Sequence, residues 1–97
     1  MIIVHDTFVC KPGQASKVAK LFKEVMGGSP ELVNIMTDMT GQYNRVVMVS
    51  QFEDLSAYER MMKEYMNPSE EQKAKFAKMA GYAEMYQTGS REIYKIW

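Results

Sequence analysis

The 97-residue sequence, with 46% hydrophobic and 25% charged residues, has the composition of an ordinary globular domain, so we expect one domain spanning residues 1–97. Twelve basic and twelve acidic residues give a formal net charge of zero, which lacks the positive excess of a nucleic-acid-binding protein. No apolar stretch approaches the roughly 20 residues needed to span a bilayer, so an integral membrane protein is excluded.

The first quarter of the chain predicts a strand followed by a helix. Residues 2–10 are rich in β-branched and aromatic side chains and end at the turn sequence Lys11-Pro12-Gly13. From Gln14 to Met26 apolar residues recur at helical spacing, and Gly27-Gly28-Ser29-Pro30 follows as a stop.

A β-hairpin and a second helix are predicted next. Residues 32–39 and 43–52 have strand composition, with Thr40-Gly41-Gln42 as the turn between them. Asp54 then stands where an N-cap belongs, because apolar residues at helical spacing continue from Leu55 to Met66.

The last third predicts another helix and a final strand. Asn67 is the expected cap, with Pro68 at the first helical position and Glu70 placed for a capping box, and the apolar side continues to Ala83. Gly89-Ser90 is the expected turn before a strand over residues 92–97.

This order predicts an α+β fold, a ferredoxin-like βαββαβ unit with a four-stranded antiparallel sheet of spatial order 4-1-3-2. The strands at 2–10 and 43–52 are then central, and both are apolar on their two faces. Since the helices can cover only one face, we expect a second copy of the chain to cover the other, giving a homodimer.

Two segments carry a resemblance to a known family. Gly41 to Val47 (GQYNRVV) and Phe52 to Glu59 (FEDLSAYE) resemble the hairpin-to-helix segment of NIPSNAP-like proteins, which share the dimeric α+β barrel superfamily with antibiotic-biosynthesis-monooxygenase-like proteins. The opening strand and its Lys11-Pro12-Gly13 turn are similar too. The superfamily includes cofactor-independent monooxygenases, haem-degrading enzymes, isomerases and members without an assigned activity. None of their catalytic motifs is found in this sequence, so no functional residue is transferred.

Three polar residues are candidate catalytic groups. His5, the only histidine, has a side chain suited to general-base chemistry, although a hydrogen-bonded sheet histidine explains it as well. Asp6 points to the opposite face, among Ile2, Val4 and Phe8, where a carboxylate needs a partner, and Arg45 is the expected one. Tyr58 lies beside a methionine-rich stripe of the second helix that suits either a core or an adaptable pocket.

These observations leave three hypotheses open. The first is an uncharacterised NIPSNAP-like homodimer that binds a small apolar or aromatic ligand. The second is a cofactor-independent monooxygenase or isomerase acting on an aromatic or polyketide-like substrate between sheet and helices, and the third is a structural module. We expect no cofactor. We expect no metal either, because the one histidine, His5, and the one cysteine, Cys10, lie on opposite faces of one strand and offer no ligand set. A single cysteine and the lack of a signal-peptide pattern favour the cytoplasm.

Overall fold

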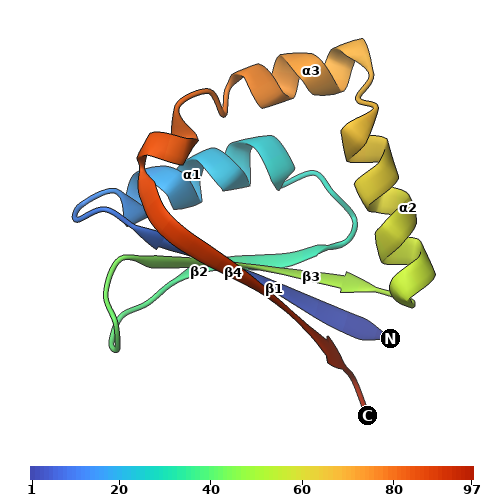
Figure 1. The fold of residues 1–97 in the computed structure, drawn as a ribbon, viewed down its shortest axis with the longest axis horizontal. Helices are drawn as coiled ribbons and strands as arrows, with labels where there is room; N and C mark the ends of the chain where they lie inside the picture. Colours follow the sequence, from blue (N-terminus) through green and yellow to red (C-terminus); the bar gives the residue numbers. More distant parts are fainter.

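The computed structural model describes residues 1–97 as a sheet covered on one face by helices. The elements follow in the order β1 (Ile2–Cys10), α1 (Ala15–Met26), β2 (Leu32–Thr37), β3 (Arg45–Phe52), α2 (Leu55–Met66), α3 (Glu70–Ala77), a short 3₁₀ helix (Tyr82–Glu84) and β4 (Tyr86–Lys95). Figure 1 shows α1, α2 and α3 on one side of the sheet and nothing on the other. None of these helices combines the length and the apolar character that crossing a membrane requires.

The sheet has four strands in the order β2-β3-β1-β4, which confirms the predicted ferredoxin-like topology. All three strand pairings are antiparallel. The alternation of β1 decides which residues face the helices: Ile2, Val4, Asp6 and Cys10 are buried there and Phe8 packs against Phe22, whereas Ile3, His5, Thr7 and Val9 are half-buried on the bare face.

The hydrophobic core lies between α1 and the central strands. Phe22 and Val18 of α1 pack with Cys10 of β1 and Val46 of β3, and Val18, Phe22 and Val46 are at most 1% exposed. A smaller cluster of Ile2, Val4 and Phe52 lies under Tyr58 and Met61 of α2. The two clusters fix α1 and α2 over the same sheet face.

The β2–β3 hairpin differs from the prediction, because its loop is longer than three residues. β2 ends at Thr37 and β3 begins at Arg45. Asp38 accepts hydrogen bonds from the backbone N–H and the Nε of Arg45, both at 3.1 Å, and so closes the loop. Tyr43 and Asn44 have φ values of +69° and +58°, a left-handed conformation incompatible with a strand, so β3 begins only at Arg45.

The helix after Asn67 begins two residues later than predicted. Ser69, not Asn67, is the N-cap, and it forms a capping box with Gln72 rather than with a glutamate. Asn67 instead ends α2, where its backbone N–H and its side chain donate to carbonyls of the last turn. The predicted N-cap of α2 is confirmed, since Asp54 Oδ1 accepts from the N–H of Ala57 at 2.8 Å.

The final strand begins earlier than predicted. Gly89 and Ser90 are not a turn but lie inside β4, paired with Phe8 and Thr7 of β1. A Cβ atom on Gly89 would lie 2.9 Å from the carbonyl oxygen of Thr7, so glycine permits a close approach of the two strands. β4 therefore runs from residue 86 and includes Arg91, whereas Ile96 and Trp97 lie beyond its end.

Candidate functional site

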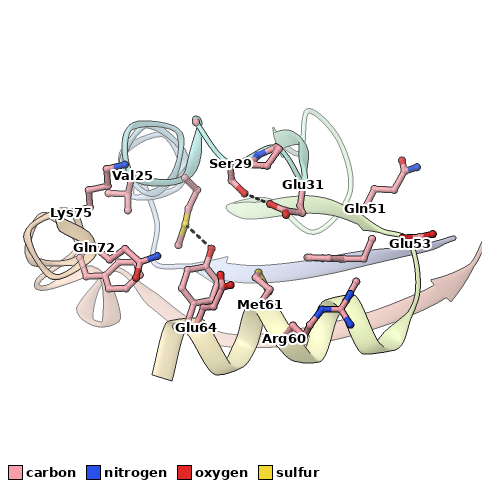
Figure 2. Close-up of a pocket in the computed structure, with 17 residues that line it drawn as sticks. Val25, Ser29, Glu31, Gln51, Glu53, Arg60, Met61, Glu64, Gln72 and Lys75 are labelled. Atoms are coloured by element: carbon pink, nitrogen blue, oxygen red, sulfur yellow. Dashed lines mark hydrogen bonds between the residues drawn. The ribbon is translucent and has the colours of Figure 1, made fainter. Parts of the chain in front are cut away.

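Two adjacent cavities lie on the helical side of the sheet. The outer one is a cleft of about 640 Å³ between α2 and the ends of α1 and α3 (Figure 2). The inner one, about 180 Å³, lies between α2 and the sheet. The two cavities are adjacent, because both are lined by Met26, Ser29, Glu31, Phe52, Met61 and Tyr65.

The outer cleft is charged, and the inner cavity is mostly apolar. Charged side chains of both signs border the cleft: Arg60, Lys75, Glu31, Glu53 and Glu64. The walls of the inner cavity come from the sheet and from α2: Val4, Leu32, Met48, Phe52, Met61 and Met62. An apolar cavity with a few polar groups is the usual form of a small-molecule site.

Three polar side chains of the inner cavity lie together where β1, β4 and α2 meet. Asp6 is 8% exposed, and its Oδ1 accepts a hydrogen bond from Nε of Arg91, its direct neighbour on β4. The Arg91 guanidinium carbon lies 5.9 Å from the ring centre of Tyr58. These three side chains, called here the polar triplet, form one end of the cavity.

The tyrosine of the polar triplet is held in its neutral form. Burial raises the pKa of Tyr58, and the charge of nearby Asp6 adds to this effect against the opposing charge of Arg91. Its hydroxyl oxygen is the one buried side-chain polar atom without a hydrogen-bond partner. The pKa of Arg91 is raised above its ordinary value, chiefly by its hydrogen bond to Asp6, so this guanidinium stays charged.

The predicted pairing of Asp6 with Arg45 is wrong. Arg45 lies opposite Val9 in the β1–β3 register and therefore faces the bare side of the sheet, away from Asp6. It forms an ion pair with Asp38 at 3.1 Å. Although burial opposes the shift, the hydrogen bonds and charge of Arg45 hold the pKa of Asp38 below its ordinary value.

The structure brings two of the three predicted site residues together. Asp6 and Tyr58 both line the inner cavity, whereas His5 points to the bare face of the sheet. There its ring packs edge to face against Tyr94, with 5.3 Å between ring centres. A catalytic role for His5, Asp6 or Tyr58 stays a prediction, and His5 is separated from the other two by the sheet.

Sequence reasoning missed Arg91, Ser50 and Glu31 as lining residues of the inner cavity. Arg91 was missed because the last strand was predicted to begin at residue 92. With Gly89 inside the strand, Arg91 and Ile93 share one face of β4, and the register with β1 pairs Arg91 with Asp6. Of the α2 methionines, Met61 and Met62 line the cavity, but Met66 is 78% exposed. No group of three or more histidine, cysteine or acidic side chains is arranged to hold a metal ion.

The ion pair within the polar triplet should be measurable as a coupling energy. Arg91→Met leaves the buried Asp6 carboxylate without its positive partner and should lower the free energy of unfolding by about 1–2 kcal/mol. This is less than for a fully buried pair, because the Arg91 side chain is 48% exposed and solvent screens the charges. The check is urea denaturation at fixed protein concentration.

Asp6→Asn supplies the matched background for this measurement. Because the Asp6→Asn variant lacks the carboxylate charge, adding Arg91→Met to it should lower the free energy of unfolding by less than the same substitution does in the parent chain. Equal costs in the two backgrounds would show that the two side chains do not interact energetically.

Comparison with solved structures shows that the fold is shared with NIPSNAP family proteins and with candidate antibiotic biosynthesis monooxygenases. A NIPSNAP family protein of unknown function from Agrobacterium tumefaciens superposes with a TM-score of 0.77 and 17% identity, over 99% of this chain and 87% of that one. An uncharacterised NIPSNAP domain protein from Burkholderia xenovorans gives 0.76 and 14%, over 100% and 95% of the two chains.

A candidate antibiotic biosynthesis monooxygenase from Deinococcus radiodurans is also similar, with a TM-score of 0.64 and 11% identity over 100% of this chain and 93% of that one. No protein-family model matches the sequence, and no curated protein matches it significantly. At these identities the similarity defines the fold, and the function has to be argued from the site.

Proposed function

We propose that this protein is a homodimer that binds a small apolar or aromatic ligand in the inner cavity of each chain. The observation that carries the proposal is an apolar cavity of about 180 Å³ that ends at the polar triplet. A cavity of roughly 150 Å³ accepts a benzene-sized molecule, so this one suits a single substituted ring. A filled core with no convergent polar groups would instead have favoured a structural module.

The bare face of the sheet supports the homodimer. It presents Ile3 and Val47 from the central strands, and Met36 and Tyr94 of the outer strands are 42% and 48% exposed on it. Apolar residues spread over all strands of one face are typical of an interaction surface. A second sheet packed face to face would cover them, in keeping with the fold of the superfamily.

Blocking the inner cavity tests ligand binding. Ethylbenzene, a one-ring apolar probe, should perturb backbone amide resonances of residues around the cavity. Met62→Trp fills the cavity from α2 and should abolish the perturbation, since the larger side chain occupies the ligand's volume. The measurement is a titration followed by ¹H–¹⁵N correlation spectra.

Met66→Trp is the matched control, because it makes the same change on the same helix at a residue that is 78% exposed. It should leave the titration unchanged. Equal ethylbenzene binding by both variants would place the ligand elsewhere and contradict the proposal.

A second candidate function is catalysis by a cofactor-independent monooxygenase or isomerase acting on an aromatic or polyketide-like substrate. The polar triplet favours it, because Asp6 supplies a carboxylate beside two hydrogen-bond donors at the end of an apolar cavity. Turnover of a quinol library, followed by oxygen uptake and product analysis, separates an enzyme from a binder. Activity that Asp6→Asn and Tyr58→Phe leave unchanged would exclude this site as its source.

A further inference from the structure

We infer that the ligand of the inner cavity is neutral and carries a carbonyl-type oxygen, which accepts hydrogen bonds from Arg91 and Tyr58. This inference rests on the proposed function and specifies the chemical class of its ligand. It follows from three properties of the cavity: its unused donors, its charge and its apolar walls.

The polar triplet has donors that the protein does not use. Arg91 donates its Nε–H to Asp6, and apart from the interaction of the guanidinium with Tyr58 its two terminal nitrogens make no contact with a protein acceptor. The Arg91 side chain is 48% exposed, so these N–H groups remain accessible. Tyr58 adds a hydroxyl that is shielded from solvent and forms no geometric hydrogen bond, which is unfavourable; a shift of the Tyr58 or Arg91 side chain is needed for a ligand acceptor to reach it.

Both groups act as donors at neutral pH. Because burial raises the pKa of Tyr58, its phenol keeps its proton. The Arg91 guanidinium has donors only. A ligand oxygen with two lone pairs can therefore accept from both, as a ketone, aldehyde, ester or amide carbonyl does.

The charge of the cavity disfavours an ionic ligand. Its lining has two carboxylates, Asp6 and Glu31, against one guanidinium, Arg91, and that guanidinium is already paired with Asp6. A carboxylate ligand at Arg91 would lie close to the Asp6 carboxylate and be repelled by it. A cationic ligand would be repelled by the charge of Arg91, and its cationic group would offer no acceptor to either donor. A neutral acceptor avoids both conflicts.

The remaining lining limits the rest of the ligand to apolar atoms. Val4, Met48 and Phe52 form the sheet side of the cavity, and Met61 and Met62 form the helix side. Flexible thioethers pack well against an aromatic ring. The class is therefore a small aromatic or alicyclic carbonyl compound.

Three one-ring probes of similar size test this class: acetophenone, ethylbenzene and benzoate. Their dissociation constants are measured by the same amide titration at pH 7. We expect acetophenone to bind at least tenfold more tightly than benzoate, because only the charge of the oxygen-bearing group differs greatly between them. Benzoate binding as tightly as acetophenone would overturn the inference.

Tyr58→Phe tests the donor directly. It should lower the ratio of acetophenone to ethylbenzene affinity about fivefold to tenfold, the effect of one hydrogen bond. The affinity for ethylbenzene should not change. The variant should fold, because it removes a buried hydroxyl that has no partner in the free protein.

Tyr65→Phe is the matched control, since Tyr65 lines the same cavity from the same helix but its hydroxyl already donates to Met26 Sδ at 3.7 Å. It should leave the affinity ratio unchanged. A ratio that Tyr58→Phe does not alter would overturn the carbonyl inference while ethylbenzene binding keeps the proposed function intact. Failure of all three probes to bind would overturn both.

Discussion

Val46→Asp should leave the chain unfolded at 25 °C, because it puts a carboxylate into the centre of the core. Val46 is 0% exposed and packs against Val18, Phe22 and Cys10, none of which can pair with a charge. An unpaired buried charge costs several kcal/mol or more, comparable to the roughly 5–15 kcal/mol that stabilises a domain. Far-UV circular dichroism and urea denaturation check this result.

Val46→Thr is the control, since it keeps the branched shape without the charge. It should cost about 1–3 kcal/mol for burying a hydroxyl and should still fold. A folded Val46→Asp variant with nearly the parent stability would contradict the position of this strand face in the core.

Val47→Asp, one residue along the same strand, should leave the fold intact and dissociate the proposed dimer. Val47 is half-buried on the bare face, opposite Thr7 of β1 and Met36 of β2, so in a single chain water can solvate the new carboxylate. In a face-to-face dimer the same carboxylate would be buried without a partner. A penalty of about 3 kcal/mol weakens association more than a hundredfold.

Sedimentation velocity at micromolar concentration measures this effect. The parent chain and Val47→Thr should sediment at twice the 11.2 kDa of one chain, and Val47→Asp at 11.2 kDa. A monomeric parent chain would refute the homodimer. A Val47→Asp variant that stays dimeric would place the interface on another surface.

The different effects expected at the neighbouring residues Val46 and Val47 show what sequence patterns can establish. The order of helices and strands was enough to predict the strand order, and the apolar residues on both faces of β1 and β3 agreed with central places for these strands. It could not tell which parity faces the helices. The covered parity depends on how α1 packs. Val18 and Phe22 of α1 contact Val46 and not Val47, so the face of Val46 is the covered one.

The candidate site was predictable only in part, for a related reason. Asp6 was conspicuous as a carboxylate among apolar residues of β1, and its need for a partner was a sound inference. Its partner, Arg91, lies 85 residues away in the sequence. Gly89, two residues before Arg91, resembles a turn residue when the neighbouring strand is not considered. Gly89 permits the carbonyl of Thr7 to approach β4 closely, and sequence alone does not reveal this contact.

The helix α2 differs from α1 in a way that bears on how a ligand enters. α1 buries Val18, Phe22 and Val25, whereas no residue of α2 is fully buried, although α2 forms one wall of the inner cavity. An element with few buried apolar contacts opens locally at a lower free energy than the rest of the fold. The amide hydrogens of α2 should therefore exchange with solvent faster than those of α1. Access to the cavity then needs only the transient detachment of one helix, while the sheet and α1 keep the polar triplet's Asp6 and Arg91 in place.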